Sequence, residues 1–184
     1  MTVSLRPSTA SDVAAALAAE NDPATRRWLC EVSAAWHERH LTDRAAEHLV
    51  VERAGTAIGF VVLVTVGGVA ELRRIVVWPQ ARGTGAGRKA LVAAIDHAFA
   101  RPGTHRVWLD VKPANAVARA LYTSVGFVEE GVLREAVLEP DGSWSSLVVM
   151  AVLDREWAAL QELGGPDPLR PALRRAPAPS DRPR

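Results

Sequence analysis

A glycine-rich segment is the part of the sequence whose residue types point most directly to chemistry. Arg82-Gly83-Thr84-Gly85-Ala86-Gly87 follows an apolar run and precedes a run with helical spacing. Glycines let several backbone N–H groups converge, and a helix N-terminus adds positive potential, so such a loop suits a phosphate or pyrophosphate. Arg82 and Arg88 flank the loop and could add charge-assisted hydrogen bonds. A flexible connector that needs positive φ angles is the simpler alternative.

Two other phosphate-binding loops can be compared with this one by spacing. A P-loop needs Gly-Lys followed by Ser or Thr, whereas Gly87 is followed by Arg88-Lys89-Ala90, so the Mg²⁺-binding hydroxyl is missing. A Rossmann loop has the spacing Gly-x-Gly-x-x-Gly in the opening strand–helix turn of its fold. Here the third glycine comes one position early, and three predicted strands precede the strand that leads into the loop. Asp110, at the end of the next strand, could still mimic the ribose-binding acid, so this alternative stays open.

The elements that must position the loop predict one mixed α/β domain. Alternating apolar residues predict strands over residues 3–6, 48–53, 57–66, 69–77, 105–111, 127–138 and 143–152. Apolar residues at helical spacing predict helices over residues 11–20, 23–40, 88–101, 114–124 and 154–163. An antiparallel run of strands followed by strand–helix–strand units indicates a mixed sheet rather than a repeat or two domains.

The predicted helix over residues 23–40 raises the question of a reactive cysteine or a metal site. Asp22-Pro23 is typical of an N-cap and first helical position. Cys30 falls in the apolar stripe of this helix, where we expect a small buried hydrophobe rather than an acyl-carrying nucleophile. His37, His40 and His48 lack the spacing of a metal site, so we expect no metal.

Taken with a second block, the loop resembles the GNAT superfamily of acetyl-coenzyme A-dependent N-acetyltransferases. Residues 75–87 match that family's motif of a strand followed by Arg-x-x-Gly-x-Gly/Ala. The second block is Asn115-x-x-Ala118-x-x-Leu121-Tyr122-x-x-x-Gly126-Phe127. The resemblance covers roughly residues 49–152. It implies an α/β (α+β) fold in a single GNAT-like domain, with a mixed, mostly antiparallel sheet that is splayed at its central strands and flanked by helices.

The resemblance also implies which residues bind the donor, acetyl-coenzyme A. Ile75, Val76 and Val77 would offer backbone groups to the pantetheine arm, because a splayed strand edge leaves main-chain groups without partners. Asn115 would bond the donor near its amide or pyrophosphate region. The residues expected to wrap the pyrophosphate are Arg82, Gly83, Thr84, Gly85, Ala86, Gly87 and Arg88.

Amide formation needs a neutral amine, a polarised thioester carbonyl and a proton for the departing thiolate. Tyr122, the single tyrosine of the chain, falls on the position that the resemblance assigns to the general acid. Glu71 and Asp110 both match positions used for a base in members of the superfamily. The choice between them stays open, with Glu71 preferred. The structural alternative for Glu71 is an ion pair with Arg73 or Arg74.

The resemblance implies an acceptor pocket made from the first two helices and the last hairpin, with an amine on a small molecule or a protein N-terminus as the acceptor. The alternative is a coenzyme A-binding sensor or interaction module without catalysis. A homodimer is left open. Residues expected to line the acceptor pocket are Trp36, His37, Asp43, Glu47 and Trp144.

Composition limits the remaining classes of function. Residues 164–184 hold six of the twelve prolines and carry a net charge of +3. Because the whole chain carries +1, residues 1–163 carry −2. We therefore expect an acetyltransferase domain over 1–163 and a disordered tail over 164–184, with a docking strap or RNA-seeking tail as the alternative. The acidic body disfavours a nucleic-acid partner. One cysteine, no apolar stretch of membrane-spanning length and no signal-like start predict a cytoplasmic protein without a membrane partner.

Overall fold

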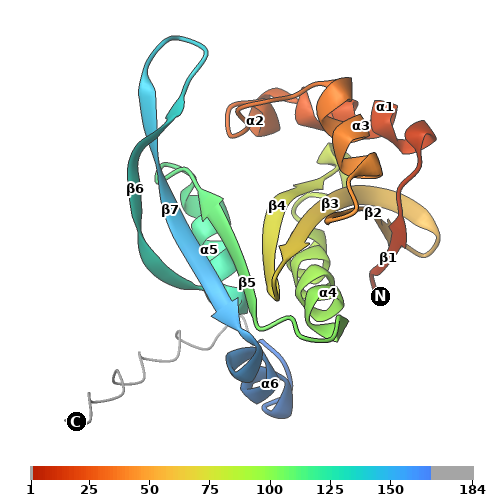
Figure 1. Ribbon diagram of the computed structural model, residues 1–184. Coiled ribbons are helices and arrows are strands. Elements are labelled where there is room, and N and C mark those ends of the chain that lie inside the picture. Colours follow the sequence, from red (N-terminus) through yellow and green to blue (C-terminus); the bar gives the residue numbers. More distant parts are fainter. Residues whose placement is uncertain (1, 167–184) are drawn as a thin grey trace.

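The structure of the protein is a computed structural model that describes residues 2–166; Met1 and residues 167–184 lie outside the described part. Its centre is a seven-stranded sheet with the strand order β1-β2-β3-β4-β5-β7-β6 (Figure 1). Only β4 and β5 pair in parallel within the described residues, and every other neighbouring pair is antiparallel. The strands are β1 (Ser4–Pro7), β2 (Ala46–Arg53), β3 (Thr56–Val66), β4 (Val69–Val77), β5 (Arg106–Val111), β6 (Val128–Leu138) and β7 (Trp144–Leu153).

Helices cover both faces of the first four strands (Figure 1). On β3, Phe60 and Val62 belong to a buried cluster with residues of α1 and α3, while Val61 and Leu63 pack with α4 on the opposite face. This alternation is the period of two that a strand imposes on its side chains. The helices are η1 (Ala10–Asp12), α1 (Val13–Glu20), α2 (Pro23–Arg26), α3 (Ala34–Thr42), η2 (Pro79–Ala81), α4 (Ala86–Ala100), α5 (Ala116–Val125) and α6 (Asp154–Glu162).

The sheet opens between β4 and β5. The two strands pair only where Val69, Ala70 and Glu71 meet residues 106–108, and beyond that point they diverge (Figure 1). β5 stays paired with β7 along its whole length. The sheet therefore has two arms, β1–β4 and β5–β7, which are joined by strand pairing only as far as Glu71. The mixed, mostly antiparallel and centrally splayed sheet is confirmed.

β4 contains an irregularity at the point where it leaves β5. Its register against β3 shifts so that Leu72 and Arg74 face consecutive residues, which leaves Arg73 as an extra residue. A one-residue bulge moves the following side chains to the other face of a strand. Leu72 therefore packs in the α4 cluster, while Val76, also at an even position, packs with α1 and α3.

The predicted single helix over residues 23–40 is wrong. The chain instead forms α2, a segment of residues 27–33 without helix, and then α3. Ser33 starts the new helix because its Oγ accepts a hydrogen bond from the Trp36 backbone N–H at 3.1 Å. Cys30 lies in the interruption and is exposed, so its expected burial is also wrong.

The predicted tail lies almost entirely outside the described residues. Its first three residues are described, and Pro166 O accepts a hydrogen bond from Arg88 Nη2 at 2.6 Å. The division into a domain over 1–163 and a disordered tail over 164–184 stays a prediction. Within residues 2–166, no helix combines the length and apolar character needed to cross a membrane.

Candidate active site

A cavity of about 620 Å³ opens where β4 and β5 diverge. Its size is that of a pocket for a small molecule or cofactor. One wall comes from residues 72–77 of β4 and from residues 27–30, and the other from residues 110–112 and α5. The hairpin of β6 and β7 contributes Val137 and Leu147. Both arms of the sheet therefore contribute to one site.

The β4 wall presents free backbone groups to the cavity. Trp78 N donates to Ile58 O at 2.8 Å, which marks a hydrogen-bonded pair between β3 and the end of β4. Hydrogen-bonded pairs alternate along antiparallel strands, so Val76 also turns its backbone toward β3. Ile75 and Val77 turn theirs toward the cavity, where β5 no longer pairs. Val77 O accepts a hydrogen bond from Arg82 Nε, so the backbone of Ile75 and the Val77 N–H are the groups that fit an extended polyamide such as pantetheine.

The glycine-rich loop at the end of this wall has the conformation that a phosphate loop needs. Gly83 and Gly85 have φ angles of +72° and +76°, a region that side chains with a Cβ rarely adopt. Gly85 is the N-cap of α4 and offers no side-chain acceptor to the first helical N–H groups. The backbone donors at this helix start are therefore left for a ligand, which fits a pyrophosphate.

The two arginines beside the loop point to other partners. Arg82 donates to Asp22 Oδ1 and Thr25 Oγ1, both at 2.7 Å, and its Nε donates to Val77 O at 3.2 Å. Arg88 donates to Ser124 Oγ at 2.6 Å and to Pro166 O. Arg82 thus fastens α2 over the cavity and Arg88 fastens α4 to α5. The predicted pyrophosphate contacts of their side chains require these bonds to be exchanged.

Arg53 is a cation near the loop that the sequence motifs did not identify. Arg53 at the end of β2 donates from Nη1 to Thr84 Oγ1 at 3.2 Å, and Thr84 Oγ1 in turn donates to Ala81 O. No spacing rule connects Arg53 to a loop 31 residues away. On the other side of the cavity, Asn115 is the N-cap of α5, and its Oδ1 accepts from Ala118 N at 3.2 Å.

Tyr122 lies on α5 and lines the cavity. Its ring packs near Phe127, with centroids 5.8 Å apart, which holds the side chain in place. Burial and, to a smaller extent, the negative charge of Asp110 raise the pKa of Tyr122 to about 12. The hydroxyl is therefore protonated at neutral pH and available as a donor.

The two carboxylates predicted as bases have different surroundings. Glu71 accepts a bidentate ion pair from Arg73, two residues along the same strand, and is absent from the described lining of the cavity. Asp110 lines the cavity. Partial desolvation of its carboxylate and the nearby charge of Glu71 raise the pKa of Asp110, while Arg73 opposes the shift. Asp110 and Tyr122 therefore share the cavity, and the alternative structural role expected for Glu71 is the one observed.

Most residues expected to line the acceptor pocket lie elsewhere. Trp36 and His37 are buried between α3 and the sheet, and Glu47 pairs with His97 of α4 on the opposite face. Asp43 is the C-cap of α3, and its carboxylate accepts from Ala45 N. Trp144 is exposed at the start of β7. The polar, aromatic and apolar side chains that line the cavity instead include Arg27, Trp28, Leu29, Cys30, Arg73, Arg74 and Lys112.

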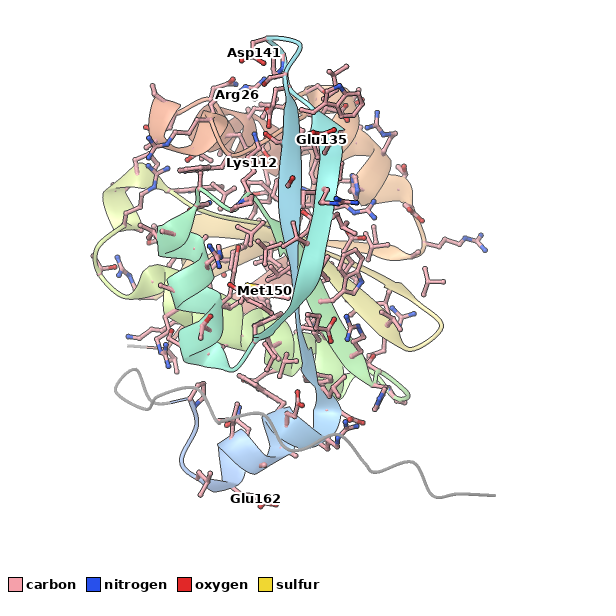
Figure 2. The ribbon with its side chains drawn as sticks, turned by 90° about the vertical axis from the view of Figure 1, so that its left-hand side faces the viewer. Arg26, Lys112, Glu135, Asp141, Met150 and Glu162 are labelled. Carbon is pink, nitrogen blue, oxygen red and sulfur yellow. The ribbon has the colours of Figure 1, made fainter. Side chains whose placement is uncertain are left out.

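Lys112 closes one end of the cavity. Its Nζ lies 2.5 Å from Glu139 Oε1 of the β6–β7 turn and 3.4 Å from Arg27 O. Figure 2 labels Lys112 below Arg26 and below the turn at Asp141. The contact joins the two arms. In the described part of the chain, no group of three or more His, Cys, Asp or Glu side chains could hold a metal ion.

The chain is similar in sequence and in fold to known proteins. Residues 13–127 match the acetyltransferase (GNAT) family. The chain is 35% identical over 114 residues to the [ribosomal protein bS18]-alanine N-acetyltransferase of Haemophilus ducreyi, covering 61% of the chain and 78% of the relative. It is 27% identical over 138 residues to the spermidine N(1)-acetyltransferase of Escherichia coli K12, covering 73% of each. The crystal structure of spermidine N-acetyltransferase from Vibrio cholerae in complex with CoA and spermine superposes with a TM-score of 0.73 at 26% identity, covering 84% of this chain and 97% of that one.

Proposed function

Because the chain belongs to the acetyltransferase (GNAT) family and transfers an acetyl group from acetyl-coenzyme A to an amine, we propose that Asp110 and Tyr122 carry this reaction beside the free edge of β4. The observation that carries the proposal is their common cavity. Both side chains line it, and the unpaired backbone of β4 forms its opposite wall.

The donor site combines the free edge of β4 with the start of α4. Acetyl-coenzyme A supplies the activated acetyl group as a thioester. Ile75 and Val77 would bind its pantetheine arm through their backbone groups. The first N–H groups of α4, with Gly83, Gly85 and the nearby charge of Arg53, would hold its pyrophosphate. Asn115 would contribute its amide group from the opposite wall.

Asp110 is the stronger candidate for the base. Its carboxylate faces the cavity, whereas the oxygens of Glu71 are already bound to Arg73. The raised pKa of Asp110 makes it a better proton acceptor than an ordinary aspartate. In this role Asp110 attracts a protonated amine and removes a proton from it, which frees the nitrogen lone pair to attack the thioester carbonyl. Glu71 would act on Asp110 by charge, across the junction of the two arms.

Tyr122 would donate a hydrogen bond to the sulfur as negative charge develops there. Its pKa of about 12 lies above the ~8.5 of an ordinary thiol, and complete proton transfer would cost about 5 kcal/mol. A hydrogen bond from Tyr122 to the developing thiolate, which takes up its proton from solvent after it has left, avoids most of that cost. The function of the hydroxyl is then electrostatic stabilisation of the leaving group.

The charges that line the cavity favour an acceptor amine without a second positive charge. Arg73, Arg74 and Lys112 line the cavity, and each is paired with a carboxylate that lies outside the described lining. Asp110 is the single carboxylate in that lining. A polyamine would bring a further ammonium group against these cations. We therefore propose a peptide N-terminus or a small monoamine as the acceptor.

A panel of acceptors tests this proposal. Alanine-initiated peptides, a neutral monoamine and spermidine are compared by release of free coenzyme A thiol. We expect kcat/KM for at least one peptide or monoamine to exceed that for spermidine by about tenfold, a difference of about 1.4 kcal/mol. Preference for spermidine would overturn the acceptor assignment. Binding of acetyl-coenzyme A without turnover of any amine would instead support the alternative of a binding module.

Two further expectations belong to the same proposal. A homodimer would be detected as a doubled mass by light scattering, and a cytoplasmic location by fractionation of cells that produce the protein. We also propose that nucleic acid is not a partner, because the domain over 1–163 carries a net negative charge.

A further inference from the structure

A chain of hydrogen-bonded polar side chains, buried except for the half-buried Ser8, takes no part in the chemistry described above. Ser8, His48, His37 and Glu20 come from four separate segments of the N-terminal half. His48 Nδ1 lies 2.8 Å from Ser8 Oγ, His48 Nε2 lies 2.8 Å from His37 Nδ1, and His37 Nε2 lies 2.9 Å from Glu20 Oε2. Glu20 and His37 are fully buried. Such groups are costly to bury unless every one is satisfied.

The hydrogen bonds of this chain have one consistent direction when both imidazoles are neutral and Glu20 is ionised. Glu20 can only accept, so His37 donates from Nε2 and accepts at Nδ1. His48 must then donate from Nε2 and accept at Nδ1, which takes the hydroxyl hydrogen of Ser8. Each member therefore orients the next, and the chain ends on the carboxylate of Glu20.

Glu20 in turn holds Arg74. Arg74 Nη1 donates to Glu20 Oε1 at 2.6 Å, across 54 residues of sequence. The guanidinium lies over the ring of Trp36, 3.7 Å from its centroid. The side chain of Arg74 is only 9% exposed, yet Arg74 belongs to the lining of the cavity. Its position is thus fixed from behind by a carboxylate and from one side by an aromatic face.

Arg74 also holds the segment that interrupts the predicted helix. Its Nη1 donates to Glu31 O at 3.0 Å. Glu31 belongs to residues 27–33, which lack regular structure, and residues 28–30 of this segment line the cavity. A segment without a hydrogen-bonding ladder of its own depends on such outside contacts for its position. Arg74 therefore joins the bulged part of β4 to residues 27–33.

We propose that Arg74 is a positioning residue for acetyl transfer, which the chain Ser8–His48–His37–Glu20 holds in place so that residues 27–33 form the acceptor wall beside β4. An apolar cluster of similar size would stabilise the fold as well as a buried ion pair. Unlike an apolar cluster, a buried arginine on β4 donates a directed hydrogen bond to one carbonyl of the irregular segment, Glu31 O. This inference rests on the proposed acetyl transfer, because the acceptor wall has meaning only for that reaction.

Arg74→Lys is the variant that tests the proposal. Lysine keeps the charge beside Glu20 but lacks the planar group that stacks on Trp36 and reaches Glu31 O. We expect the acceptor KM to rise about tenfold or more, while kcat at saturation and the Kd of acetyl-coenzyme A change less than about threefold. Glu20→Gln alters the partner of Arg74 without touching the cavity, and we expect a smaller change in the same direction.

Arg39→Lys is the matched control. Arg39 forms an ion pair with the side chain of the same Glu31, at 3.1 Å, but both side chains are well exposed. Exposed pairs contribute little, so acceptor KM should stay within about twofold of the unaltered protein. An equal rise of acceptor KM in the Arg39 and Arg74 variants would overturn the proposal, as would an unchanged KM in Arg74→Lys or an equal loss of donor and acceptor binding.

Hydrogen exchange separates this inference from the proposed function. In Arg74→Lys without any substrate, amides of residues 27–33 should exchange about tenfold faster, with α4 and β5 unchanged. Unaltered exchange in this segment would overturn the positioning role even if no amine is turned over by the protein. Faster exchange together with no turnover would support the positioning contact and reject the proposed acceptor chemistry.

Discussion

The two arms of the sheet form the walls of one cavity, but they are stabilised in different ways. The arm of β1–β4 is covered on both faces, by α1 and α3 and by α4, and contains the buried chain that ends on Arg74. The arm of β5–β7 ends in β6, which is exposed along almost its whole length and pairs with β7 alone among the described strands. Figure 2 shows β6 lying across the front of β7, with the turn near Asp141 extending beyond the helices.

The two arms therefore differ in how well they tolerate substitution. Side chains of the β1–β4 arm that shape the cavity are tied to buried partners, so changing them also changes stability. Side chains of the hairpin, such as Leu133 and Trp144, are exposed and have few buried partners to lose. Exposed positions of the hairpin can therefore be substituted at little cost in stability, whereas the edge of β4 that faces the cavity is constrained by its packing.

The largest expected effect is that of Tyr122→Phe on the β5–β7 arm. The ring and its packing against Phe127 are kept, and the hydrogen bond to the leaving sulfur is lost. We expect kcat to fall by roughly 10²–10⁴-fold with little change in the Kd of acetyl-coenzyme A. Single-turnover rates and calorimetry measure the two quantities. An unchanged kcat would remove the hydroxyl from the mechanism, and an equal loss of donor binding would make Tyr122 part of the donor site.

The second largest expected effect tests which arm of the sheet supplies the catalytic base. Asp110→Asn should lower kcat/KM by about 10²-fold, whereas Glu71→Gln, on β4, should lower it less than tenfold. In the unaltered protein, activity should fall as the pH drops through the pKa of Asp110, which lies above the usual aspartate value, because the base is then protonated. A larger loss for Glu71→Gln than for Asp110→Asn would transfer this role to the other arm.

A pair of glycine substitutions compares the packing of the two arms directly. In Gly59→Ala, the added Cβ would lie less than 3.0 Å from Val76 O, so β4 must shift at its donor-binding edge. We expect a loss of about 1–3 kcal/mol in stability and weaker donor binding. Gly131→Ala, on β6, meets no atom within 4 Å and should change stability by less than about 0.5 kcal/mol. Thermal unfolding of both variants, with and without acetyl-coenzyme A, checks the contrast; equal losses would contradict it.

The smallest effect is a dependence of stability on pH that comes from the β1–β4 arm. Burial, followed by the charges of His37 and His40, lowers the pKa of His48 to about 4, against the opposing charges of Glu20 and Asp12. Between about pH 6.5 and pH 4 the unfolded chain binds a proton that the folded chain excludes, so this contribution reduces stability as the pH falls through that window. His48→Gln should show a flatter dependence of Tm on pH. An identical slope in both proteins would rule His48 out as its source.

Several features of the fold and site could be predicted from the sequence because they depend on local residue types. Gly83 and Gly85 adopt the positive φ angles expected of a phosphate loop, and Gly126 ends α5 with a φ of +118°. Asn115 is the N-cap of α5, one residue after the predicted helix start at residue 114. Conformational demands of this kind are met by the residue itself or by its near neighbours, so they can be recognised in a single sequence.

Other features were decided only by the tertiary structure. The break at residues 27–33 depends on Ser33 as a cap and on Arg74 from a distant strand, although the apolar spacing alone favours one helix. The partners of Arg82 lie 60 and 57 residues away, and they turn its side chain from the loop that its position suggests. A one-residue bulge at Arg73 sends the following side chains to the opposite faces of β4.

The sequence by itself thus determined the loop, the caps and the alternation of most strands, because these follow from backbone preferences over a few residues. The burial of His37 and the position of residues 27–33 were decided by contacts between segments far apart in the chain. An ion pair or a buried carboxylate has no local signature, since its free energy depends on which partners the fold brings within hydrogen-bonding distance.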